Sequence, residues 1–132
     1  MADLVASTTI QDGQRLAVMR FANVSDGSGE SAGVKVDASA LEAMASGSKS
    51  TNLKIMKCWW TISGMDVDLL WDASTNVHAI SLTSDGAGFL DFSAFGGLPN
   101  TAGSGKTGDI LITTRGHTNL DTYTIILELQ KG

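Results

Sequence analysis

The chain has 132 residues, of which 42% are hydrophobic and 17% are charged, and its formal net charge is −5. This length fits one domain that can bury a core without a disulfide, and the composition is too apolar for a disordered chain. The cations are scattered, so we expect no direct binding of nucleic acid. No apolar run approaches the roughly 18 residues of a membrane span, so we expect no membrane insertion.

Alternating apolar positions and regularly spaced turn signals predict an all-β domain. Thr, Ser, Asp and Gly fill most polar positions, which is typical of strands joined by turns. The clearest alternation places Val67, Leu69 and Trp71 on one face of a strand. The predicted strands span residues 14–23, 33–36, 53–62, 66–71, 77–82, 88–92, 109–114 and 122–129.

These strands are expected to form one domain over residues 10–132, preceded by an N-terminal arm over residues 1–9. We predict an antiparallel β-sandwich of two sheets, of which the jelly roll is one form. One short helix is expected near residues 38–45, with Asp37 or Ser39 as its cap and Leu41 with Met44 as its apolar pair. A Gly-rich connection is expected over residues 93–108.

Residues 103–107, Gly-Ser-Gly-Lys-Thr, are similar to the end of a phosphate-binding loop. The full motif needs a glycine where this chain has Asn100, and it opens a helix whose amides bind the phosphates. The residues that follow have strand character instead. We therefore interpret the segment as a loop that enters a strand, and we expect no nucleotide cofactor.

The oxygen-bearing side chains from Asp26 to Asp37 have the spacing of a calcium loop. Ser31 stands where such a loop needs glycine, and the flanking helices are missing. His78 and His117 are the two histidines, too few for a usual zinc site, and neither adjoins a nucleophile-turn motif. The sequence therefore predicts no metal site and no catalytic residues.

Asp66 and Asp68 share one face of the strand over residues 66–71, where an acid–base pair or a cation site is conceivable. A sandwich strand must place something polar outward, so we interpret them as a solvated face. Cys58 is the single cysteine, which excludes an internal disulfide. Its place inside a predicted strand favours a buried, inert thiol.

Trp59 and Trp60 are adjacent, so they must point to opposite sides of the same strand. One of them is expected in the core. The other lies either under a loop or at the surface, where an exposed Trp is a typical anchor of a protein interface. The sequence leaves open which one is buried.

Three stretches resemble small structural proteins of tailed bacteriophages: residues 11–19 (QDGQRLAVM), 64–73 (GMDVDLLWDA) and 95–100 (FGGLPN). The likeness spreads over about residues 9–129 and is to head decoration, or cement, proteins with a β-sandwich fold. The resemblance implies a location on the capsid surface, with assembly in the host cytoplasm. It also implies two kinds of partner, the major capsid protein and further copies of the chain in a homodimer or homotrimer.

The hypothesis is therefore a decoration protein that binds the outside of a phage head and stabilises contacts between capsid subunits. The arm would add a strand to a neighbouring sheet. The alternatives are another virion component, such as a tail or fibre receptor-binding module, and a carbohydrate-active enzyme using Asp66, Asp68 or Asp91. The candidate interface residues are Leu4, Val5, Trp59, Trp60, Phe95, Leu98 and Pro99.

Overall fold

The computed structural model describes residues 4–50, 52–83 and 86–131, and within them the chain forms nine strands, two 3-10 turns and no α-helix. The strands are β1 (Leu4–Asp12), β2 (Leu16–Asp26), β3 (Gly33–Val36), β4 (Lys54–Ser63), β5 (Asp66–Trp71), β6 (Val77–Leu82), β7 (Gly86–Asp91), β8 (Ile110–Arg115) and β9 (Asn119–Gln130). The 3-10 turns are η1 (Ala38–Ala40) and η2 (Ser93–Phe95).

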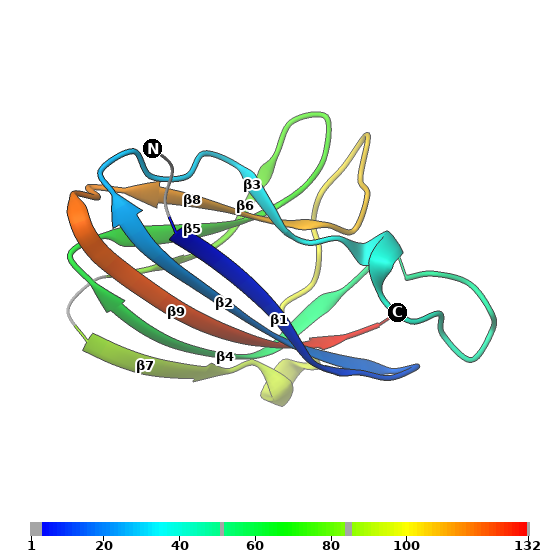
Figure 1. The fold of residues 1–132 in the computed structure, drawn as a ribbon. Helices are drawn as coiled ribbons and strands as arrows, with labels where there is room; N and C mark the ends of the chain where they lie inside the picture. The colour runs from blue at the N-terminus through cyan, green and yellow to red at the C-terminus, as the bar shows by residue number, and fades with distance from the viewer. Residues whose placement is uncertain (1–3, 51, 84–85, 132) are drawn as a thin grey trace.

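The strands make two antiparallel sheets that face each other (Figure 1). The larger sheet has the order β1-β2-β9-β4-β7, and the smaller has the order β3-β8-β5-β6. Without β1, these are the two four-stranded sheets of a double Greek-key jelly roll, so the predicted sandwich and its jelly-roll form are confirmed. Viral capsid domains, lectins and cupins all use this fold, so it does not by itself select a function.

The core lies between the sheets and follows from the alternation of each strand. β9 turns Tyr123, Ile125, Leu127 and Leu129 inward, and all four are buried. β5 buries Val67, Leu69 and Trp71 from the opposite sheet, as its sequence predicts. Burying each large apolar side chain contributes about 1.5–3 kcal/mol, which makes these inward rows the main source of stability.

The expected arm is wrong for the part that the structure describes. Residues 4–9 belong to β1, which pairs with β2 of the same chain in the register Leu4↔Val24 to Thr9↔Met19. Both faces of this edge strand are exposed, so its sequence lacks the alternation that identifies a half-buried strand. The rest of the arm, residues 1–3, lies outside the described residues.

The helix expected near residues 38–45 is also wrong, because it is reduced to the single turn η1. Asp37 does cap it, since its Oδ1 accepts a hydrogen bond from the amide of Ser39 at 3.0 Å. The turn ends at Leu41, whose φ of −79° and ψ of 158° are extended and whose side chain is buried. Anchoring Leu41 in the core is incompatible with a helix through Met44, and so short a helix is not stable alone.

A buried cation at Lys131, directly after β9, contacts Asp12 at the end of β1. Its fully buried Nζ donates hydrogen bonds to Asp12 Oδ1 at 2.6 Å and to the carbonyl of Glu42 at 2.7 Å. The other carboxylate oxygen of Asp12 accepts a hydrogen bond from the amide of Glu42 at 2.8 Å. The residue after β9 thereby fastens the β1–β2 hairpin to the segment that follows η1.

Candidate functional site

An aromatic pair lies on the outer face of the larger sheet, away from the core. Trp59 on β4 and Phe89 on β7 are cross-strand partners, and their rings stack with centroids 5.2 Å apart. Trp59 is 37% exposed and Phe89 is 50% exposed. Ile126 on β9 is the partner of Trp59 on its other side. We call Trp59, Phe89 and Ile126 the aromatic row.

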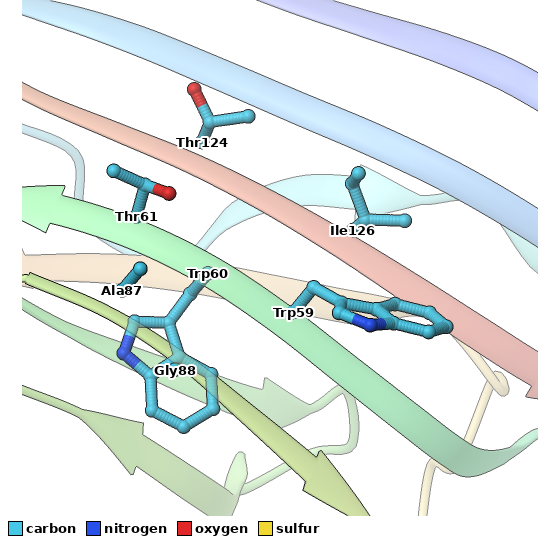
Figure 2. A pocket seen from close by; sticks show the side chains of 7 residues that line it. All are labelled: Trp59, Trp60, Thr61, Ala87, Gly88, Thr124 and Ile126. Atoms are coloured by element: carbon cyan, nitrogen blue, oxygen red, sulfur yellow. The ribbon is translucent and has the colours of Figure 1, made fainter.

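A row of small side chains runs beside the aromatic row, two residues further along β4. It consists of Thr61, its β9 partner Thr124 and its β7 partner Ala87, and the pairing continues to Ala22 and Ala6. Because these side chains are short, the face is hollowed next to Trp59, as Figure 2 shows. One hollow of about 200 Å³ lies beside Trp59, another of about 400 Å³ lies over β1, β2 and β9, and Thr124 lines both.

Charged residues occupy the row on the opposite side of the aromatic row. Glu128, Lys57 and Asp91 are cross-strand neighbours on β9, β4 and β7. Lys57 Nζ lies 3.8 Å from the Glu128 carboxylate. An exposed apolar centre beside hollows and a polar rim has the composition of a protein-binding patch. We call the aromatic row together with the row of small side chains the binding face.

The structure settles which tryptophan faces the core, although neither is fully buried. Trp60 points to the inner side of β4 and is half-buried against the core, whereas Trp59 points outward. The six-membered ring of Trp60 covers Gly88, its cross-strand partner on β7. The sequence predicted the opposite orientations of the two side chains, but it did not predict Phe89 and Ile126 as neighbours, because the register of β4 against β7 and β9 depends on long-range pairing.

Of the other candidate interface residues, Val5 borders the binding face, because it lines the larger hollow together with Ala6 and Thr124. Val5 lies on β1, at the far edge of the sheet from β7, and Leu4 begins β1 with a side chain outside the described part of the structure. Phe95 is 65% exposed in η2 and packs against Phe92, with ring centroids 5.9 Å apart. Leu98 is half-buried and exchanges backbone hydrogen bonds with Ile55, and Pro99 follows it at the surface.

Among the carboxylates of the enzyme alternative, Asp91 is not brought together with Asp66 and Asp68. Asp66 and Asp68 lie on β5 of the smaller sheet, and Asp91 lies on the outer face of the larger sheet. Partial burial alone would raise the pKa of Asp68, but hydrogen bonds from Arg115 and Ser81 outweigh it and lower the pKa. The pKa of Asp91 is also lowered, chiefly by the hydroxyl of Ser93. A general acid needs a raised pKa, so neither residue has the chemistry of that role.

A serine, a histidine and an aspartate do meet on the outer face of the smaller sheet, which the sequence did not predict. His78 Nε2 lies 2.7 Å from Ser81 Oγ, and Ser81 Oγ donates to Asp68 Oδ1 at 2.5 Å. In a catalytic triad the carboxylate orients the histidine instead. Asp68 is also held by two hydrogen bonds from Arg115, at 2.7 and 3.0 Å. We interpret the cluster as a surface ion-pair network.

The segments that resemble ligand loops are used for internal contacts. Lys106 Nζ donates to Asn52 Oδ1 at 2.7 Å, and Thr107 Oγ1 donates to Asp72 Oδ2 at 2.7 Å, just before β8. Glu30 accepts a hydrogen bond from Tyr123 at 2.6 Å and pairs with Lys35. Among the described residues, no three His, Cys, Asp or Glu side chains are close enough to hold a metal ion.

Comparison with protein families and with curated protein sequences finds no match. Among solved structures, the chain is similar to a cupin superfamily protein from Desulfitobacterium hafniense DCB-2 at 12% identity and a TM-score of 0.34, over 96% of this chain and 80% of that one. A similarity at this level carries no functional argument. Within the described ranges, no helix is long and apolar enough to cross a membrane.

Proposed function

We propose that this chain is a decoration protein of a phage head, and that it binds the major capsid protein through the binding face. Two observations support the proposal. The sequence stretches at residues 11–19, 64–73 and 95–100 resemble head decoration proteins, and the stacked pair of Trp59 and Phe89 presents an apolar anchor at the surface. The exposed aromatic pair is the single observation on which the location of the contact depends.

The position of Trp59 in the middle of three paired strands suits this role. Trp59 is positioned by pairing on both sides, with Ile126 on β9 and Phe89 on β7. An aromatic side chain held by its neighbours loses little conformational entropy when a partner covers it. The adjoining hollow can accept a protruding side chain of the partner, as the pockets around interface hot spots do. Many copies on one shell would then link capsid subunits through the sum of modest contacts.

A rebinding experiment tests the proposal. Phage heads stripped of the protein would be incubated with purified chain, and the bound amount would be measured as a function of concentration. We expect wild type to bind and Trp59→Ala to bind at least about 30-fold more weakly, because truncating a central aromatic anchor costs 2 kcal/mol or more. Rebound wild type should also raise the temperature at which the heads rupture.

The matched control is Val34→Ala, which truncates an exposed apolar side chain on β3 of the other sheet. This variant should bind like wild type. Equal loss of binding in both variants would show that the binding face has no special role. No binding of wild type to stripped heads, or heads that rupture at the same temperature with and without it, would contradict the decoration function.

A receptor-binding module of a tail or fibre is the second candidate, and the threonine hydroxyls of Thr61 and Thr124 beside Trp59 favour it. An aromatic ring next to a shallow, partly polar hollow is suited to a small ligand as well as to a protein. Binding of the isolated chain to host cells, abolished by Trp59→Ala, together with antibody labelling at the tail, would support this candidate over the first.

A further inference from the structure

The free edge of the larger sheet at β1 differs from the other sheet edges of the described chain. β1 has nine residues, whereas the edge strands β3, β6 and β7 have four, six and six. The pairings of β3 and β6 contain irregularities, and β7 carries two glycines, which weaken a strand. Short or irregular edges resist pairing with another chain, so three of these edges are protected and β1 is not.

The sequence of β1 also lacks the usual protection. Residues 4–11 contain no charged residue and no proline. A bulge interrupts the pairing with β2 only beyond Thr9, so that Leu4 to Thr9 form a regular edge. Val5 is 48% exposed and Ile10 is 55% exposed, which places two of the large exposed apolar side chains on this one strand. A long, uncharged edge with a regular stretch of six residues is a template for a further strand.

We propose that β1 pairs antiparallel with β1 of a second copy, so that the larger sheets of two chains form one continuous sheet. A two-fold axis perpendicular to the sheet brings the same strand to both sides of the contact, which is the simplest closed arrangement of two copies. We take a second copy as the occupant because the uncharged edge matches itself: although the chain carries a net charge of −5, residues 4–11 of both copies are uncharged. No like charges face each other along residues 4–11.

The centre of the regular stretch lies at Ala6 and Ser7, so the axis passes close to Ser7. Val5 and Thr8 lie on either side of this centre, and both are β-branched residues that suit a paired strand. The dimer would also place two aromatic rows on one surface. Seven strand spacings of roughly 4.8 Å separate β4 of one copy from β4 of the other, so the strands that carry Trp59 lie about 34 Å apart across the sheet.

This inference concerns the chain alone and does not depend on what the binding face contacts. If the proposed function holds, the dimer deepens it, because two linked faces bind a repetitive shell far more tightly than one. Measurements on purified protein without phage heads therefore separate a failure of the dimer from a failure of head binding.

The test compares Ser7→Lys with Ser48→Lys in sedimentation experiments over a range of concentrations. Both serines are exposed, and Ser48 lies in the loop between η1 and β4. We expect wild type and Ser48→Lys to be dimers, and Ser7→Lys to be a folded monomer, because two lysines would meet near the axis. A wild type that stays monomeric at every concentration, or two variants with the same mass, would overturn the proposal.

Cross-linking supplies an independent measurement that does not depend on disrupting the edge. Ser7→Cys treated with a short bismaleimide should give a covalent dimer in high yield, whereas Ser48→Cys should stay monomeric. Cys58 is buried and does not compete for the reagent. Equal cross-linking of the two variants, or none at Ser7→Cys, would contradict pairing through β1, and a strand of another protein would then be the occupant to seek.

Discussion

Trp59 stacks on Phe89 across the β4–β7 pair, with ring centroids 5.2 Å apart and ring planes inclined by 24°. Trp60 follows Trp59 on β4, and Gly88 precedes Phe89 on β7. On the inner face of the same sheet, the ring of Trp60 covers Gly88. The two tryptophans therefore bind the edge strand β7 from both faces. The inner contact holds β7 in register, and the outer contact presents the aromatic row.

Gly88→Ala tests the inner contact. A Cβ at this position would overlap the six-membered ring of Trp60, so the ring must move out of its place against the core. We expect the free energy of unfolding to fall by about 1–3 kcal/mol, as in other overpacked sites. Urea unfolding measures the change. Gly103→Ala is the control, since nothing lies within 4 Å of the added Cβ there, and an equal loss in both variants would contradict the packing role of Trp60.

Lys131→Met tests the buried cation at the end of β9. The substitution leaves the Asp12 carboxylate without its ammonium partner at 2.6 Å. The Asp12 carboxylate is 22% exposed, so water replaces part of the lost contact, and we expect the free energy of unfolding to fall by about 1.5–3 kcal/mol, the usual contribution of hydrogen bonds to a charged group. Lys57→Met is the matched control, because its ammonium is partly exposed and its carboxylate partner lies at 3.8 Å. The control should change stability by about 1 kcal/mol or less.

The ion pair of Asp12 and Lys131 should make the free energy of unfolding depend on pH in the acid range. Burial alone would raise the pKa of Asp12, but hydrogen bonds from Lys131 and from the Glu42 amide outweigh it and lower the pKa. With the folded-state pKa below the unfolded-state value, the stabilisation is complete above about pH 4 and is lost as the pH falls through the folded-state pKa. Between about pH 5 and about pH 2 we expect the free energy of unfolding to fall less for Asp12→Asn than for wild type, because the variant has no carboxylate to protonate at this position. Parallel pH profiles would contradict this assignment.

The thiol of Cys58 should not react in the folded protein. Burial raises its pKa to about 12, so almost no thiolate is present at neutral pH. We expect an aromatic disulfide reagent to modify Cys58 only as fast as the chain unfolds, and at once in denaturant. Modification of the native protein at the rate of a free peptide thiol would show that the strand opens locally around β4.

The strands that are buried on one face could be predicted from the sequence, and the edge strand could not. Val67, Leu69 and Trp71 alternate because one face of β5 is core, and this pattern predicts β5 with its observed bounds. β1 has no buried face, so its residues carry no comparable pattern, and the sequence alone predicts an arm there. Leu41 and Met44 have helical spacing, but the core takes Leu41 in an extended conformation.

The candidate site shows the same limit. The sequence predicts that the side chains of Trp59 and Trp60 point to opposite faces of the sheet, because successive residues of a strand alternate in direction. Which of them faces outward depends on the bulge in β4 between Ile55 and Lys57 and on pairing with strands far along the chain. The neighbours of Trp59, which are Phe89 and Ile126, come from that pairing, so the composition of the binding face became visible only in the fold.

Electron cryo-microscopy of particles that carry this protein tests the central claim most directly. The proposal predicts jelly-roll density on the outside of the head, with the outer face of the β1-β2-β9-β4-β7 sheet against the capsid protein and Trp59 covered by it. Density at the tail, or a head-bound chain whose Trp59 faces solvent, would contradict the claim that this face binds the shell.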